Sequence, residues 1–191
     1  MGSESAPLSE PPVPGMAGRR ILVYGVTGSG KTTTAARISG LTQVPWYAID
    51  DLTWDADWTP VPADEQRRRV QSICAGDAWV IDSAYGMWLD IPLARADLIV
   101  GLDLPRALSF WRLLRRTTGN IIHRRQLCNG NQETWTGTFL RRDSILAWHF
   151  RSFARKRQRM RQWQADPAMP EVVLLRSRAE VRHWLASLSG A

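Results

Sequence analysis

The chain of 191 residues has only two lysines, Lys31 and Lys156, although its formal net charge is +7. It also has only two cysteines, Cys74 and Cys128, which form no CxxC pair. The three histidines show no metal-binding spacing. The sequence therefore indicates neither a disulfide framework nor a zinc site. No apolar run approaches the ~20 residues of a membrane helix, and the first residues lack the basic segment and apolar core of a signal peptide. These absences predict a cytoplasmic protein with no membrane partner.

Residues 1–18 are rich in proline, serine and glycine, so we expect a disordered leader there. Residues 19–191 are long enough for a single domain with a sizeable core. The positive charge is unevenly placed: residues 105–161 contain thirteen arginines and one lysine against two acidic residues, a net charge of +12, which leaves −5 for the rest. A segment this positive favours binding to an anionic partner. The candidates are the phosphates of a nucleotide, the backbone of a nucleic acid and, less favoured, a membrane surface.

Short and almost wholly apolar runs alternate with helical patterns, which is typical of βαβ units around a parallel sheet. Strands covered on both faces have this composition. The expected strands are residues 20–24, 46–49, 78–81, 98–102 and 172–175. The expected helices are residues 31–39 (closed by Gly40), 63–75 (closed by Gly76), 106–117, 142–163 and 178–187. The sequence therefore predicts an α/β fold.

Residues 117–138 fit neither the helical nor the strand period. They are polar and contain asparagine and glycine, and long connections of this kind are usually functional. We interpret the region from 117 to about 140 as a lid.

The most specific pattern follows the first expected strand, where residues 25–32 read GVTGSGKT and match GxxxxGK[ST] in the strand–loop–helix context that the motif requires. Glycines let successive backbone N–H groups turn toward phosphate oxygens. Lys31 would reach the β- and γ-phosphates of ATP, and the Thr32 hydroxyl would bind Mg²⁺. The expected ATP-binding residues are Gly25, Val26, Thr27, Gly28, Ser29, Gly30, Lys31, Thr32 and Thr33. The alternative is a glycine-rich turn that only caps a helix.

Acidic residues follow two further expected strands. Asp82 ends the run AWVID, and Asp50 and Asp51 end WYAID. The carboxyl ends of parallel strands face the ligand crevice, so we expect Asp82 to hold the metal together with Thr32. Asp50 or Asp51 would orient an acceptor hydroxyl or take its proton, and we expect Asp50 and Asp82 to be the catalytic carboxylates. The alternative for each carboxylate is a helix cap or a loop.

Arginines gather in the lid and its flanks, where guanidinium groups are suited to neutralise the charge of a transferring phosphoryl group. We expect one to three of them to be catalytic and the rest to lie on the surface. The candidates are Arg112, Arg115, Arg116, Arg124, Arg125, Arg141 and Arg142. Trp54 and Trp58, close to Asp50 in the sequence, either pack or stack on an acceptor.

The ordered motifs GVTGSGKTT, IDDLTWDADW, WVIDSAY, ARADLIVGLDLPRALSFWRLLRR, CNGNQE and RRDSILAW resemble those of small P-loop kinases of the adenylate kinase and shikimate kinase class. Within that class they are most similar to adenylate-kinase-like DNA topology modulation proteins. The resemblance spans residues 19–188. It implies a three-layer P-loop NTPase fold with a five-stranded parallel sheet in the order 2-3-1-4-5, and an ATP and Mg²⁺ site at the P-loop.

The same resemblance implies an acceptor site near Asp50 and Asp82, and a lid to which Arg112, Arg116 and Arg124 belong. Of these arginines we favour Arg116 and Arg124 as catalytic. The family usually shows Asp-Gly-Asn-Tyr and Asp-Ala-Leu-His-Trp where this chain has DSAY and DDLTW. Because these differences lie on the acceptor side, the resemblance does not identify the acceptor.

The sequence is best explained by an ATP-dependent, Mg²⁺-requiring kinase whose acceptor is a nucleotide or a small hydroxylated metabolite. The second hypothesis is a nucleic-acid-associated P-loop regulator in which residues 105–161 bind phosphate backbone. A GTPase is disfavoured because the sequence has no Asn-Lys-x-Asp guanine-recognition motif.

Overall fold

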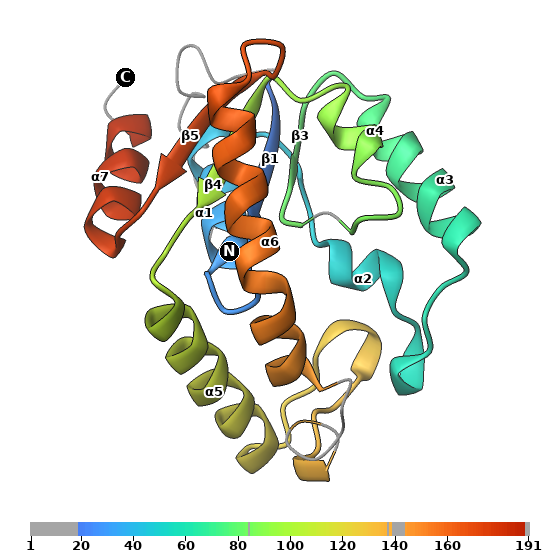
Figure 1. Ribbon diagram of the computed structural model, residues 1–191. Helices are drawn as coiled ribbons and strands as arrows, with labels where there is room; N and C mark the ends of the chain where they lie inside the picture. Colours follow the sequence, from blue (N-terminus) through green and yellow to red (C-terminus); the bar gives the residue numbers. More distant parts are fainter. Residues whose placement is uncertain (1–18, 84, 137, 139–143, 190–191) are drawn as a thin grey trace, which may run out of the picture.

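The computed structural model describes residues 19–83, 85–136, 138 and 144–189, so the expected leader lies outside the described residues. At its centre is a five-stranded parallel sheet in the order β2-β3-β1-β4-β5. Helices cover both faces of this sheet (Figure 1). The expected α/β fold and the strand order implied by the resemblance are therefore confirmed.

The strands are β1 (Arg20–Gly25), β2 (Trp46–Tyr47), β3 (Trp79–Ile81), β4 (Leu98–Leu102) and β5 (Glu171–Leu175). The α-helices are α1 (Lys31–Thr42), α2 (Ile49–Thr53), α3 (Ala63–Cys74), α4 (Asp90–Leu93), α5 (Arg106–Ile122), α6 (Ile145–Ala165) and α7 (Arg178–Ser189). Two 3-10 helices lie in connections, η1 (Ala56–Trp58) and η2 (Cys128–Gly130). The sequence did not predict α2, α4, η1 or η2, because elements this short carry too few residues to show a period.

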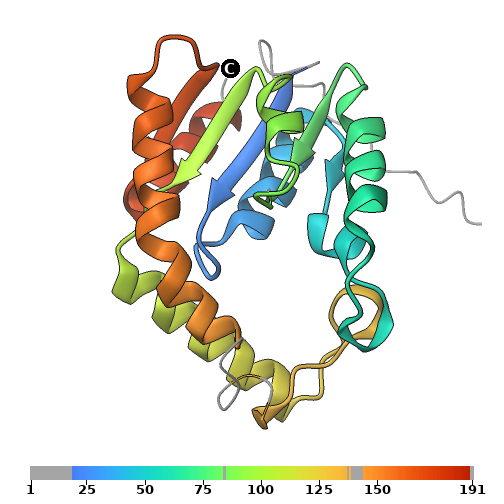
Figure 2. The same cartoon turned by 45° about the vertical axis from the view of Figure 1, so that its right-hand side comes forward.

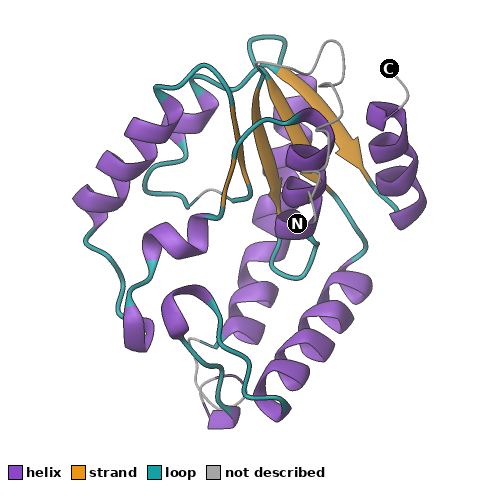
Figure 3. Cartoon of the chain, turned by 180° about the vertical axis from the view of Figure 1, so that it is seen from behind, coloured by secondary structure: helices purple, strands orange, loops and turns teal. Residues whose placement is uncertain are grey.

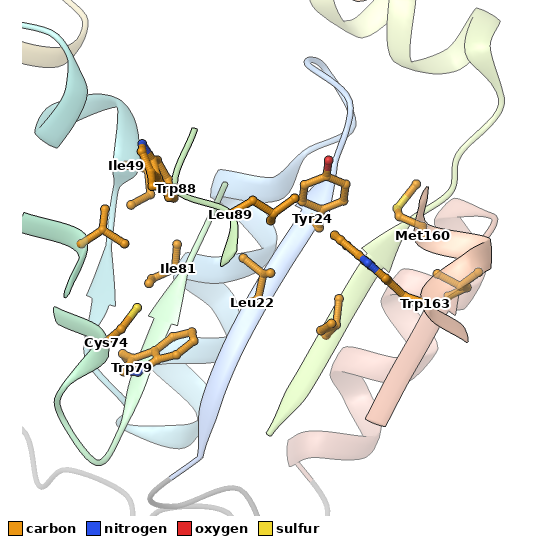
Figure 4. Close-up of a cluster of buried hydrophobic side chains, with 13 residues drawn as sticks. Leu22, Tyr24, Ile49, Cys74, Trp79, Ile81, Trp88, Leu89, Met160 and Trp163 are labelled. Atoms are coloured by element: carbon orange, nitrogen blue, oxygen red, sulfur yellow. The ribbon is translucent and has the colours of Figure 1, made fainter. Parts of the chain in front are cut away.

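The side chains of β1 alternate between two cores. Ile21 and Val23 face the layer that contains α1 and α7, which lies toward the viewer in Figure 3. Leu22 and Tyr24 face the opposite layer, which contains α3 and α6, and Figure 4 shows this second core. There the ring of Tyr24 meets Trp163 of α6 edge-on, with 4.8 Å between ring centroids. Burial on both faces explains the unbroken apolar run of β1.

Helix α1 does not end at Gly40 as the sequence predicted, but continues to Thr42. The helix stops at Gln43, which has a positive φ of 59° and whose N–H donates to the Ser39 carbonyl. Gly40 is exposed, and no atom lies near the position of a Cβ. A glycine there costs the helix only ~1 kcal/mol, so it does not terminate it.

Strand β2 ends at Tyr47 rather than at Ile49. The backbone N–H of Ile49 donates to Asp82 Oδ1 at 3.0 Å instead of to a neighbouring strand. This hydrogen bond directs the chain out of the sheet and into α2. The expected strand was therefore too long, because a tertiary contact ends it.

Helix α5 continues to Ile122, so the first residues of the region expected to be a lid are helical. Thr117 and Asn120 are buried, and both donate to the Glu133 carboxylate, at 3.4 and 2.9 Å. Their polarity concealed the helical period. The next helix, α6, begins after Ser144, whose Oγ accepts a hydrogen bond from the Ala147 N–H, and the earlier start expected at residue 142 lies outside the described residues.

The strands all point the same way, and α5, the lower part of α6 and residues 123–136 extend past their carboxyl ends (Figure 2). The loop after β1 opens toward these segments. In the described part of the chain, no helix has both the length and the apolar character that crossing a membrane requires.

Candidate active site

The motif predicted to bind phosphate forms a tight loop between β1 and α1, in the expected strand–loop–helix context. Gly28 and Gly30 have positive φ angles of 80° and 97°, a backbone conformation that residues with a side chain rarely adopt. Space is limiting as well: a Cβ on Gly28 would meet the backbone oxygen of Ser109, and one on Gly30 would meet the Arg112 guanidinium. Helix α5 thus packs directly against this loop, which requires glycine at both positions.

Lys31 folds back over the P-loop, and its Nζ donates to the Val26 carbonyl at 2.9 Å. Burial lowers the pKa of Lys31 to about 8; the nearby Asp50 and Asp82 carboxylates oppose this, and the positive charge of Arg116 adds to it. Lys31 therefore lies close to both carboxylates predicted to act at the site, those of Asp50 and Asp82.

The P-loop also contains a polar atom that has no partner. The Ser29 hydroxyl is buried and makes no hydrogen bond within the described residues. A phosphate oxygen would satisfy it, and the adjoining ammonium of Lys31 would neutralise the charge. The loop consequently fits the phosphate chain of a nucleotide.

Asp82 follows β3, which neighbours β1 in the sheet. Burial raises the pKa of Asp82, while hydrogen bonds from the Ile49 N–H and the Thr32 hydroxyl and the charge of Lys31 oppose this shift. Thr32 is exposed in the first turn of α1. The structure thus brings together the two residues predicted to bind metal.

The oxygen ligands of this pair suit Mg²⁺, which usually keeps several waters and binds through one or two protein groups together with phosphates. The described residues contain no cluster of three or more His, Cys, Asp or Glu side chains able to hold a metal ion. A magnesium ion here would therefore depend on Thr32, Asp82, the phosphate chain and water.

Asp50 lies in the first turn of α2, and the Tyr85 hydroxyl donates to its Oδ1 at 2.9 Å. Tyr85 in turn accepts a hydrogen bond from Trp54 Nε1 at 3.4 Å. Burial, and then the negative charge of Asp50, raise the pKa of Tyr85, so its hydroxyl stays protonated and acts as donor. Asp51 is exposed on the same helix.

The remaining predicted ATP-binding residues occupy the loop and the start of α1. Val26 is buried, Thr27 is partly buried and Thr33 is exposed. Gly25 ends β1 beside Leu102 of β4. The roles of these four residues in binding ATP stay predictions.

The predicted lid arginines fall in different places. The Arg112 Nη1 donates to the Ser29 carbonyl at 3.1 Å, so this side chain lies on the P-loop itself. Arg116 is exposed one turn later, within electrostatic reach of Lys31. Arg124 is exposed beyond α5 with a positive φ of 47°, and the described residues show no contact between it and the P-loop. Arg141 and Arg142 lie outside the described residues.

Residues 127–132, here called the η2 segment, contact the loop that follows α2. The buried Asn131 accepts a hydrogen bond from the Trp58 N–H at 2.6 Å and donates to the Asp55 carbonyl at 2.8 Å. Trp58 Nε1 donates to the Gln132 carbonyl at 2.9 Å. The part of the chain expected to be a lid is thus bound to the part expected to hold the acceptor.

Sequence reasoning missed three residues at this site: Tyr85, Asp103 and Lys156. Asp103 follows β4, the other neighbour of β1, and its side chain is only 1% exposed; it forms ion pairs with Arg157 and Arg161 of α6 at 2.8 and 3.0 Å. The position of Asp103 directly after an apolar run could have identified it from the sequence. For Lys156 the signal was the scarcity of lysine, because its Nζ contacts the P-loop at the Gly25 carbonyl.

No family model matches the sequence, and no curated protein sequence matches it either. The fold is similar to that of a gluconokinase from Sinorhizobium meliloti 1021, with a TM-score of 0.50 and 15% identity over 90% of this chain and 94% of that chain. It is also similar to a shikimate kinase from Acinetobacter baumannii in complex with shikimate, with a TM-score of 0.52 and 12% identity over 89% and 90% of the two chains.

A shikimate kinase from Bacteroides thetaiotaomicron is comparably similar, with a TM-score of 0.50 and 14% identity over 90% and 96% of the two chains. At these identities the similarity shows a shared P-loop kinase fold and does not assign a substrate. The general resemblance to small P-loop kinases is thus supported. The narrower resemblance to DNA topology modulation proteins finds no support in these structures.

Proposed function

We propose that the protein is an ATP-dependent kinase that transfers a phosphoryl group to a hydroxyl of a small metabolite or nucleotide. The observation that carries this proposal is the meeting of Lys31, Asp82 and Asp50 at the carboxyl end of the central strand, within one electrostatic cluster. That edge of an open α/β sheet is where ligands bind. The P-loop kinase fold shared with the structures above supports the proposal.

In the proposed reaction the P-loop amides and Lys31 bind the phosphate chain of ATP. The acceptor hydroxyl attacks the γ-phosphorus, the bond from that phosphorus to the β–γ bridging oxygen breaks, and ADP leaves. Asp50 takes the proton of the attacking hydroxyl, with Tyr85 holding its orientation. Arg112 and Arg116 would supply the added positive charge that stabilises the transferring group.

Thr32 and Asp82 would hold Mg²⁺, which supplies neutralisation of the β- and γ-phosphate oxygens when it is bound. Asp82 also fixes the start of α2 through the Ile49 N–H. In this way it couples the phosphate site to the helix that carries Asp50. Arg124 remains a proposed lid residue that would act only after closure.

Labelled ATP incubated with Mg²⁺ and a panel of acceptors tests the proposal. The panel includes gluconate and shikimate, the kinds of hydroxylated acid that the similar kinases are named for, together with nucleoside monophosphates. Transfer of the label to an organic product above the rate of hydrolysis is expected for at least one acceptor. Transfer that continues at the wild-type rate in Lys31→Ala would refute the assignment.

A nucleic-acid-associated regulator is the second candidate, and the observation that favours it is the net charge of +12 in residues 105–161. Several arginines of that segment already have partners, including Arg112 on Ser29 and Arg161 on Asp103. This hypothesis predicts DNA or RNA binding that weakens steeply with salt. A plot of the logarithm of the binding constant against that of the salt concentration should have a slope of about −0.9 for each phosphate contacted. Absence of binding at ~50 mM salt would remove this candidate.

A further inference from the structure

Both lysines of the chain lie at the P-loop, although they are far apart in the sequence. Lys31 begins α1 and donates from Nζ to the Val26 carbonyl at 2.9 Å. Lys156 projects from α6 and donates from Nζ to the Gly25 carbonyl at 3.3 Å. Because these carbonyls belong to consecutive residues, the ammonium groups of both lysines contact the same turn.

Lys156 is fixed in this position by its surroundings. Its Nζ lies over the Tyr24 ring, 5.4 Å from the centroid, which is a cation–π contact. The Tyr24 hydroxyl accepts a hydrogen bond from Arg159, one turn further along α6, at 3.4 Å. The ion pairs of Asp103 with two arginines of α6 attach the same helix to the end of β4.

Positive charge around Lys156 exceeds negative charge. Lys31, Arg155 and Arg159 oppose its protonation, whereas the carboxylate of Asp50 favours it. With burial as the largest cause, these charges lower the pKa of Lys156 to about 7. Neither lysine forms an ion pair with a carboxylate in the described part of the chain. Asp50 and Asp82 act on these lysines only through space, so two ammonium groups without a direct ion pair meet at one turn, and such an arrangement is suited to an anion.

We propose that Lys156 is a second phosphate-binding residue, which together with Lys31 binds the phosphate chain of the nucleotide. The inference rests on the proposed function, because it adds a residue from α6 to the same nucleotide site. On binding, the ammonium of Lys156 exchanges a carbonyl acceptor for a charged phosphate oxygen, which is the stronger hydrogen bond. Helix α6 then supplies a ligand to the phosphate site in addition to the P-loop.

The test measures the affinity of the full chain for inorganic triphosphate by calorimetry, without acceptor and in a buffer free of phosphate. Lys156→Gln is compared with Arg151→Gln, because Arg151 is exposed on the same helix and its loss changes the net charge equally. We expect Lys156→Gln to weaken binding about tenfold or more. Arg151→Gln is expected to change it by less than about twofold, since an exposed charge contributes little.

A third variant, Lys156→Arg, keeps a charged donor that does not titrate near neutral pH. It is expected to bind triphosphate within a few fold of wild type. The wild-type affinity should fall as pH rises from 6 to 8, because Lys156 loses its proton in that window, and the fall should be smaller in Lys156→Arg. Lys31 and the triphosphate titrate in both proteins, so the comparison isolates Lys156.

Equal affinities of Lys156→Gln and Arg151→Gln, with binding lost in Lys31→Ala, would overturn the inference and leave the proposed function standing. A wild-type protein that binds neither triphosphate nor Mg-ATP would overturn both. Thermal unfolding shows whether each variant is folded. If Lys156→Gln does not fold, the pH dependence of Lys156→Arg decides alone, and a fall in affinity equal to that of wild type contradicts the inference.

Discussion

The Tyr85 hydroxyl donates to Asp50 Oδ1 at 2.9 Å, which joins the loop after β3 to the first turn of α2. The same hydroxyl accepts a hydrogen bond from Trp54 Nε1, so its own direction is fixed. A carboxylate that takes a proton must be held within hydrogen-bond reach of the reacting hydroxyl. If Asp50 takes the proton as proposed, Tyr85 is its positioning residue.

We predict that Tyr85→Phe lowers kcat about three- to tenfold and leaves KM for ATP unchanged, because only the orientation of Asp50 is lost. Asp50→Asn should lower kcat by about 10² or more, the usual contribution of a general base. Tyr47→Phe, the same change in strand β2, is the control. Steady-state kinetics and thermal unfolding together decide, and a Tyr85→Phe enzyme with altered stability but wild-type kcat would contradict the role.

The parts of the site that the sequence predicted are those set by local rules. The P-loop follows from glycines at 28 and 30, whose positive φ angles are uncommon for residues with a side chain. Asp82 follows from its place after a buried strand. These features depend on a few adjacent residues. Their geometry follows once the strand and the helix form.

The parts that the sequence did not reveal depend on contacts between distant segments. Asn120 looked like a loop residue because its partner, Glu133, lies on another segment. Lys156 reaches Gly25 because α6 packs across the sheet, where Trp163 contacts Tyr24 and Arg157 pairs with Asp103. No periodicity within α6 identifies which of its basic residues turns inward.

The docking of the η2 segment on the loop after α2 leads to a second prediction. Asn131→Ala removes an acceptor for the Trp58 N–H and a donor to the Asp55 carbonyl, and the Asn131 side chain that makes both partly buried hydrogen bonds is itself buried. We expect a loss of about 1–3 kcal/mol in the docking of this segment. Hydrogen exchange should become faster in residues 127–132 and at Trp58.

Asn129→Ala is the matched control, because Asn129 is exposed although it also donates to backbone carbonyls, those of Asp51 in α2 and of Trp54 just after it. Its substitution should change exchange in the segment less than Asn131→Ala does. Equal effects of the two variants would show that the buried amide has no special part in the docking.

A third prediction concerns the attachment of α6. Asp103 is nearly fully buried, whereas Arg157 and Arg161 are about half exposed, with side-chain exposures of 41% and 51%. Asp103→Asn leaves the arginines able to reach water, so we expect a loss of about 2–3 kcal/mol in the free energy of unfolding, at the lower end for a broken buried pair. Urea denaturation measures it.

Asp90→Asn provides the comparison, because Asp90 pairs with Arg67 on the surface at 2.8 Å. An exposed pair of this kind contributes less than about 1 kcal/mol. If Asp103→Asn and Asp90→Asn lower the free energy of unfolding equally, the pairing of Asp103 does not attach α6 to the sheet.

A fourth prediction follows from the low pKa of Lys156, which at about 7 lies well below the ordinary lysine value of 10.5. The unfolded chain binds this proton more tightly, so the free energy of unfolding rises with pH from about 7 to 10.5. Lys156→Gln removes this dependence. Its melting temperature should therefore exceed that of wild type below pH 7, by about 2–4 °C for each 1 kcal/mol, and the difference should narrow by pH 10.

Differential scanning calorimetry in phosphate-free buffer measures this difference, because a bound anion would offset the repulsion. Arg151→Gln should follow the wild-type curve. A constant difference between wild type and Lys156→Gln across this pH range would mean that Lys156 titrates as an ordinary exposed lysine.

The most direct measurement is the titration of the full chain with Mg-ATP by calorimetry, in wild type and in Lys31→Ala. We predict saturable binding to wild type with one nucleotide per chain, and a loss of at least about tenfold in affinity in the variant, because Lys31 donates to the phosphate chain from the P-loop. Wild-type protein that shows no binding, or a variant that binds Mg-ATP as tightly as wild type, would contradict the central claim.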